Sequence, residues 1–206
     1  MIITYLGKQF FKIQQGDLVL AFNPISKDSK LAGPRFGSAL AFSTTNHPDY
    51  NGFEMVTHGE TVPFEISGPG DYEVKDIFIK GILSEAVVDG KKYINTIYSL
   101  SIKNISLCML GPVTLASLTA DAKGQIDPPD IMFVPINGND TLSSTEAYKL
   151  ALSLEAKIII PMDFDGSNLK AFLKEGGQDN VKAIEKLTIK AKELAGREGE
   201  IVVLQS

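Results

Sequence analysis

Short apolar runs alternate with turn-forming residues up to about residue 85 of the chain. β-branched and aromatic residues fill most of these runs, and Gly, Pro, Asp and Asn separate them. This pattern is typical of β-strands, and helical periodicity is almost absent. We predict seven strands here: residues 2–5, 9–13, 18–22, 40–43, 63–66, 71–74 and 77–83. Asp89-Gly90, which follows, predicts a two-residue hairpin turn.

Strands and helices alternate in the second half of the chain. The predicted strands are residues 93–102, 105–110, 131–135, 158–161 and 200–204. Ser143 and Glu146 have the spacing of a capping box, and helical spacing continues through Ala147, Leu150, Ala151 and Leu154. A second helix is expected to begin after Ser167 and to stop at Gly176-Gly177. The short apolar run 158–160 predicts a strand covered on both faces. The pattern therefore predicts a β-rich α/β protein, which we interpret as one domain over residues 1–206.

Composition and charge exclude some classes of function. The chain has 206 residues, 44% of them hydrophobic, which is enough for a sizeable core. No apolar run approaches the roughly 20 residues of a membrane span, and no secretory leader is recognisable. The single Cys108 cannot form an intrachain disulfide and lies in an apolar run typical of a buried strand. We therefore expect a cytoplasmic protein.

The charged residues give no general attraction to nucleic acid. The net charge is −5, without long blocks of one sign. Lys27, Lys30 and Arg35 form a local basic cluster, which is best interpreted as a solvated loop. Nucleic-acid binding through that loop stays open as a further possibility, although the net charge does not support it.

Residues 43–52, Ser-Thr-Thr-Asn-His-Pro-Asp-Tyr-Asn-Gly, contain two good metal ligands, His47 and Asp49. This segment and six others resemble, in order along the chain, the metallo-β-lactamase-fold superfamily, and within it the lactonase-like branch often labelled Zn-dependent hydrolases. The segments are Met1–Phe11, Val19–Pro24, Asn46–Gly52, Gly68–Val74, Asn95–Tyr98, Phe133–Pro135 and Ile158–Asp163.

The resemblance implies a four-layer αββα sandwich with one or two metal ions at one edge, between the sheets. The family motif H-x-H-x-D-H falls on Thr45, His47, Asp49 and Tyr50, and the other three ligand positions fall on Met109, Pro112 and Asp163. If residues 45–47 are extended, the first two positions share a side, and Pro48 suits the first turn of a short helix that carries the next two. The loop 137–140 borders the active site in relatives.

Four of these seven positions carry poor zinc ligands, namely Thr45, Tyr50, Met109 and Pro112. The first site, which is normally three histidines, would have only one imidazole. The second site retains Asp49 and Asp163 with a phenol, and these oxygens suit a hard ion held loosely. Strand alternation turns Cys108 away from the face of Met109, so the thiol is not expected to compensate.

We favour a degenerate protein that has lost its metal centre and acts in binding or scaffolding, as a pseudoenzyme without a cofactor. In this interpretation the site is a polar pocket closed by hydrogen bonds. Tyr50 is a neutral donor to Asp49 or Asp163, and His47 carries a proton between those carboxylates. The partner is a small molecule or a protein, and homo-oligomers are plausible because relatives often assemble.

The alternative is a working hydrolase of a lactone, phosphodiester or nucleic acid. It would use one divalent cation (Mn, Mg or Zn) at His47, Asp49, Asp163 and Tyr50, with Asp49 and His47 as the catalytic residues. The sequence does not decide whether the chain is an enzyme.

Overall fold

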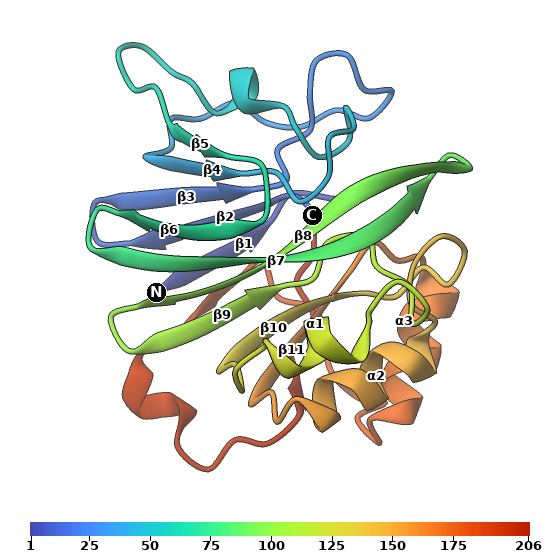
Figure 1. Ribbon diagram of the computed structural model, residues 1–206. Helices are drawn as coiled ribbons and strands as arrows, with labels where there is room; N and C mark the ends of the chain where they lie inside the picture. Colours follow the sequence, from blue (N-terminus) through green and yellow to red (C-terminus); the bar gives the residue numbers. More distant parts are fainter.

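Two mixed β-sheets face each other in the computed structural model, which describes residues 1–206 (Figure 1). The first sheet has six strands in the order β12-β1-β2-β3-β4-β5. Neighbouring strands from β12 to β3 pair antiparallel, whereas β3 pairs parallel with β4, and β4 with β5. The strand bounds are β1 Ile2–Tyr5, β2 Phe11–Gln15, β3 Leu18–Phe22, β4 Leu40–Phe42, β5 Phe64–Ile66 and β12 Lys186–Thr188.

The second sheet has seven strands in the order β13-β11-β10-β9-β8-β7-β6. Strands β6 to β9 pair antiparallel, and β9, β10, β11 and β13 are parallel. Its bounds are β6 Gly70–Val74, β7 Ile77–Val88, β8 Lys91–Ile102, β9 Ile105–Met109, β10 Ile131–Pro135, β11 Ile158–Met162 and β13 Glu200–Ile201. The carboxyl ends of β9, β10 and β11 therefore meet at one edge of the sheet.

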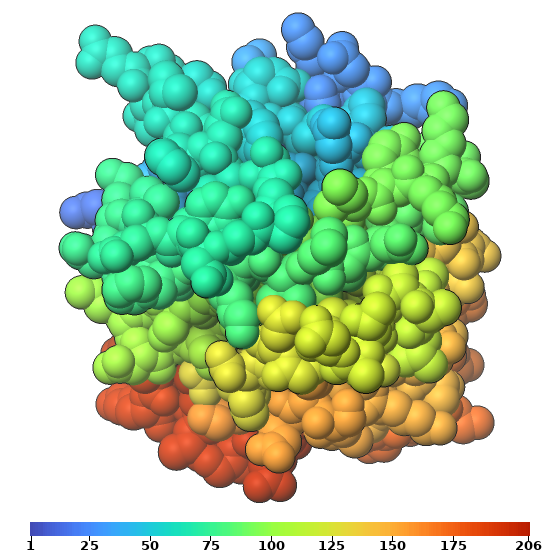
Figure 2. Space-filling view, in the orientation of Figure 1, coloured from blue at the N-terminus to red at the C-terminus, as the bar shows by residue number.

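A long hairpin of β7 and β8 projects beyond the sheets. Asp89 and Gly90 form its tip with φ values of 51° and 72°, which confirms the predicted two-residue turn. Both strands are longer than predicted, because the ladder continues through polar residues as far as the pair Val88 and Lys91. On the face shown in Figure 2, the hairpin (green) lies between the N-terminal part of the chain (blue) and the C-terminal half (yellow to orange).

Three α-helices follow in the second half: α1 Ala120–Gly124, α2 Ser144–Ser153 and α3 Gly166–Glu175. The predicted capping box of α2 is confirmed, with both reciprocal hydrogen bonds between Ser143 and Glu146. The predicted start of α3 after Ser167 was wrong, because Asp165 caps the helix by accepting from two backbone N–H groups. No helix has the length and apolar character needed to cross a membrane.

Two hydrophobic clusters cover both faces of the seven-stranded sheet. One lies between the sheets and includes Ile158 and Ile160, while the other lies under the helices and includes Ile159. This explains why the run 158–160 is wholly apolar, as predicted.

The outer face of the six-stranded sheet lacks an α-helix. A small cluster that includes Phe10, Ile25 and Val56 is buried there beneath the loop 23–39 and the 3₁₀ helix η1, Phe53–Met55. A second 3₁₀ helix, η2, spans Ala191–Leu194 near the C-terminus. The predicted α/β class with two facing sheets is confirmed, and a loop takes the place of the fourth, helical layer.

Candidate functional site

One cavity of about 150 Å³ is lined by four of the seven positions at which the resemblance places metal ligands. These are Asp49, Tyr50, Pro112 and Asp163. The cavity lies where β4, β9, β10 and β11 end, and the hairpin tip and the loop 137–141 form other walls. The fold therefore gathers the carboxylates of the predicted second site, and the loop 137–140 borders them as expected.

Thr45, at the position of the first histidine, is buried and its hydroxyl forms a hydrogen bond. It is 1% exposed, and its Oγ1 donates to Asn95 Oδ1 at 3.0 Å. The Asn95 amide nitrogen donates in turn to Ser84 Oγ at 2.7 Å and to the Leu110 carbonyl at 2.9 Å. The Thr45 hydroxyl therefore belongs to a closed network of buried hydrogen bonds.

Gly111 shows how tightly this network is packed. Its φ is +71°, and a Cβ added there would lie 2.2 Å from Asn95 Oδ1. Met109 is 1% exposed and belongs to the core between the sheets, so its thioether does not reach the cavity. These groups do not fit a zinc ion, which takes imidazole, carboxylate or thiolate ligands.

Cys108 points to the opposite face of β9, as strand alternation predicts. It belongs to the cluster under the helices, and burial raises the pKa of its thiol to about 12. A thiol that stays protonated at neutral pH is a poor metal ligand.

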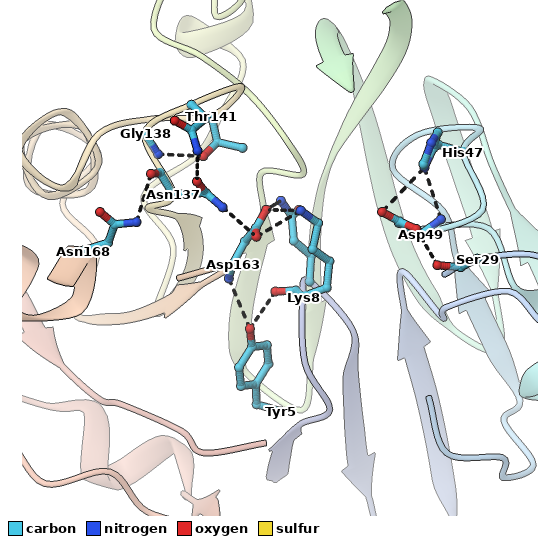
Figure 3. A network of polar contacts seen from close by, with 12 residues as sticks. Tyr5, Lys8, Ser29, His47, Asp49, Asn137, Gly138, Thr141, Asp163 and Asn168 are labelled. Atoms are coloured by element: carbon cyan, nitrogen blue, oxygen red, sulfur yellow. Dashed lines mark hydrogen bonds and ion pairs between the residues drawn. The ribbon is translucent and has the colours of Figure 1, made fainter. Parts of the chain in front are cut away.

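Asp163, at the last ligand position, forms an ion pair with Lys8 (Figure 3). Lys8 Nζ lies 2.9 Å from Asp163 Oδ2 and 3.0 Å from Oδ1. The side-chain amides of Gln9 and Asn137 also donate to this carboxylate, at 3.4 and 3.3 Å. A lysine ammonium and two amide groups thus satisfy the carboxylate without a metal ion.

The backbone holds Lys8 and Asp163 in place. The Asp163 N–H donates to the Lys8 carbonyl at 2.8 Å, and the Tyr5 hydroxyl donates to the same carbonyl at 2.7 Å. Both Lys8 and Asp163 have a φ of +53°, in the left-handed region that residues other than Gly, Asn and Asp rarely adopt. Burial is the main cause that raises the pKa of Tyr5, and its hydroxyl therefore stays a neutral donor.

The segment that carries His47 and Asp49 is a turn, so the predicted short helix was wrong. The Tyr50 N–H donates to the His47 carbonyl at 2.8 Å, and the His47 N–H donates to the Thr45 carbonyl at 2.8 Å. Residues 45–47 are accordingly not extended. The Pro48 carbonyl accepts from Ser26 N–H instead of from a helical turn, since this segment packs against the loop that follows β3.

His47 does not connect Asp49 with Asp163, which corrects our expectation. Its Nδ1 is 3.9 Å from Asp49 Oδ2, and its Nε2 is 3.7 Å from Asp89 Oδ2. Nδ1 also accepts the Asp49 backbone N–H at 3.2 Å. Ser29 Oγ donates to Asp49 at 2.5 Å. His47 lines a neighbouring pocket of about 290 Å³, which shares Asp49 and Asp89 with the cavity.

Tyr50 lines the cavity and remains a neutral phenol. It is 1% exposed, and its hydroxyl makes no hydrogen bond with Asp49 or Asp163, contrary to our expectation. Burial raises its pKa most, and the negative charges of Asp163, Asp49, Asp89 and Asp140 raise it further. The cavity is therefore an acidic environment.

No three His, Cys, Asp or Glu side chains come together in a group that could hold a metal ion. The dinuclear zinc centre implied by the resemblance requires several such groups around each ion, so the residues present do not fit it.

Lys8 and Asn95 are site residues that the sequence analysis missed. Asn95 had a recognisable signal, because a polar amide stands within the otherwise β-forming run 93–98. Lys8 follows Gly7 in a turn and had no recognisable signal in the sequence, because its partner Asp163 is 155 positions away. Asp89 was interpreted only as a turn residue, although it also lines the cavity.

The remaining candidates lie away from the cavity. Lys27, Lys30 and Arg35 are exposed on the loop 23–39, which agrees with a solvated loop. Lys30 reaches the pocket of His47. His58 is exposed in a turn, as predicted.

Comparisons with known proteins place the chain in a family. A family model described as a β-lactamase superfamily domain matches residues 2–163. No curated protein matches the sequence.

Solved structures resemble this chain over nearly its whole length. A candidate Zn-dependent hydrolase of the metallo-β-lactamase superfamily from Thermotoga maritima is 24% identical, with a TM-score of 0.76 over 98% of this chain and 97% of that one. A candidate metal-dependent hydrolase from Parabacteroides distasonis is 15% identical, with a TM-score of 0.67 over 98% and 93%. A metallo-hydrolase from Ignicoccus hospitalis is 16% identical, with a TM-score of 0.63 over 92% and 99%. At these identities the likeness establishes the metallo-β-lactamase fold alone. The family match covers well over half of the chain, which therefore belongs to the metallo-β-lactamase superfamily.

Proposed function

We propose that this protein is a degenerate member of its superfamily that binds a ligand and does not hydrolyse one by metal catalysis. The observation that carries the proposal is the hydrogen bond from Thr45 to Asn95, within a packed network where a metal-binding imidazole would be needed. A hydrolytic metal ion generates hydroxide near neutral pH and polarises the scissile bond. No other group in the cavity supplies both functions.

The charge and size of the cavity support a small, positively charged ligand. Four carboxylates line it, those of Asp49, Asp89, Asp140 and Asp163, against one ammonium group. Such a wall attracts cations and repels phosphodiesters and nucleic acids. Its volume of about 150 Å³ corresponds to about five water molecules in the liquid. A primary amine with a few heavy atoms fits both constraints.

A second candidate is a hydrolase with a single hard ion, because structures similar to this one are described as Zn-dependent or metal-dependent hydrolases. One observation favours it, because Asp49, Tyr50 and Asp163 line the same cavity. The ion would have to displace Lys8 from Asp163 and to draw the carboxylates together. The proposal of a binding protein requires neither rearrangement.

The two candidates differ in the metal content of the protein. We expect elemental analysis of protein purified without chelators to find well below one equivalent of zinc, manganese or iron. We also expect millimolar Mn²⁺ or Mg²⁺ to leave the melting temperature unchanged, because a ligand stabilises only a state that binds it. Metal that copurifies at about one equivalent or more and survives dialysis would reject the proposal. In that case Asp49→Ala should abolish both metal binding and any hydrolysis.

The proposed ligand class has its own test. Small primary amines should raise the melting temperature, and carboxylic acids of the same size should not. Asp140→Asn, which removes one exposed carboxylate from the rim of the cavity, should reduce the amine effect. An equal response to amines and acids would show that the charge of the cavity does not select the ligand.

A further inference from the structure

The ammonium group of Lys8 occupies a position that a cation would take beside Asp163. It lies about equally far from both carboxylate oxygens, at 2.9 and 3.0 Å. The Asp163 side chain is only 7% exposed, so its charge needs a partner. Lys8 is the only cationic side chain that lines the cavity.

The backbone of Lys8 is in the left-handed conformation and is hydrogen-bonded to Asp163. A left-handed φ of +53° favours Gly, Asn or Asp, whereas a lysine there is strained. Asp163 has the same φ, and its N–H donates to the Lys8 carbonyl at 2.8 Å. Lys8 and Asp163 are therefore joined through both their backbones and their side chains.

The side-chain amides of Gln9 and Asn137 also lie against Asp163. Gln9 is fully buried, and its amide nitrogen lies 3.4 Å from Asp163 Oδ2. Its Oε1 is buried without any hydrogen-bond partner, so one acceptor beside the carboxylate is unsatisfied. Carboxylate and amide oxygens are the ligands that Ca²⁺ and Mn²⁺ prefer, often completed by water. An amide can also rotate to present its oxygen in place of its nitrogen.

We propose that Lys8 is a tethered cation, which neutralises Asp163 in place of the second metal ion and prevents a divalent cation from binding there. The inference rests on the proposed function, in which the native protein holds no metal. It adds that the polar groups around Asp163 can still bind a hard cation once the ammonium group is removed.

The experiment measures Mn²⁺ binding to Lys8→Ala. The variant should be less stable than the native protein, and 10 mM Mn²⁺ should raise its melting temperature by about 3–6 °C. The native protein should shift by less than about 1 °C under the same conditions. Loss of the electron paramagnetic resonance signal of free Mn²⁺ gives a direct count of bound ions. Lys8→Ala without a response to Mn²⁺ by either measurement would overturn the inference.

Four further variants separate the role of the charge from general damage to the fold. Lys8→Arg keeps a cation beside Asp163 and should not respond to Mn²⁺. Lys8→Gly removes the charge but relieves the left-handed backbone, so it should fold and respond even if Lys8→Ala does not fold. Lys8→Ala/Asp163→Asn should lose the response. Lys157→Ala is the matched control, because Lys157 pairs with Asp130 at 2.7 Å away from the cavity. A response of Lys157→Ala equal to that of Lys8→Ala would overturn the inference.

Failure of this inference is distinguishable from failure of the proposed function. Native protein that binds about one equivalent of Mn²⁺ tightly contradicts both. Native protein free of metal, with a Lys8→Ala variant that binds none, contradicts only the tethered cation.

Discussion

Replacing Asn95 by alanine is expected to be among the most destabilising single changes at this site. The Asn95 side chain makes three buried hydrogen bonds, with Thr45 Oγ1, Ser84 Oγ and the Leu110 carbonyl. Gly111 lies against Asn95 and has no side chain that could fill the space left by the substitution. Asn95→Ala therefore leaves a cavity and several buried polar groups without partners.

The magnitude follows from these contacts. Each hydrogen bond contributes about 1 kcal/mol net, and an unsatisfied buried partner costs about 1–3 kcal/mol. Three lost bonds with a partly relaxed cavity give a total of about 3–5 kcal/mol. In a protein of this size, 1 kcal/mol shifts the melting temperature by about 2–4 °C, so a decrease of roughly 6–20 °C is expected.

Urea unfolding followed by circular dichroism measures the loss of stability. Asn51→Ala is the matched control, since Asn51 makes one exposed side-chain hydrogen bond with Asn46 at 2.8 Å. The control should change the free energy of unfolding by less than about 0.5 kcal/mol. An Asn95→Ala variant within about 1 kcal/mol of this control would refute the idea that a tightly packed network fills the first metal position.

Three other predictions concern groups outside the cavity. The thiol of Cys108 is fully buried with its pKa raised to about 12, so a thiol reagent should modify it only in denatured protein. Burial opposes ionisation of Asp130, but hydrogen bonds from Lys157 and Ser106 outweigh it and lower the pKa of Asp130 from its usual value. The ionised Asp130 carboxylate should therefore stabilise the fold fully above about pH 5, and this stabilisation should be lost as the pH falls through the lowered pKa. The free energies of unfolding of the native protein and of Asp130→Asn should accordingly converge in acid. Ser143→Ala removes the capping box of α2 and should cost about 1 kcal/mol in urea unfolding.

Local sequence signals predicted much of the fold. The turn at Asp89-Gly90 and the capping box at Ser143 depend on residues close in sequence, and both are confirmed. Alternation along β9 also placed Cys108 and Met109 on opposite faces. The helix expected at Pro48 is absent, because the Pro48 carbonyl accepts a tertiary hydrogen bond from Ser26 N–H in the loop after β3.

The site was less predictable, because its contacts join distant parts of the chain. The resemblance correctly placed Asp49, Tyr50 and Asp163 around one site, and they line one cavity. It did not predict which side chains would form hydrogen bonds or ion pairs with them. Asp163 pairs with Lys8, and Thr45 pairs with Asn95, at separations of 155 and 50 residues. No periodicity or turn signal specifies such pairs. The sequence showed which of the seven positions carry poor zinc ligands, whereas the structure shows which side chains surround those positions.

The most direct test of the central claim is anomalous diffraction, recorded on both sides of the zinc absorption edge, from crystals of protein purified without chelators. We predict no zinc peak in the cavity, with Lys8 Nζ in contact with the Asp163 carboxylate. Two strong peaks near His47, Asp49 and Asp163, with Lys8 displaced, would contradict the account.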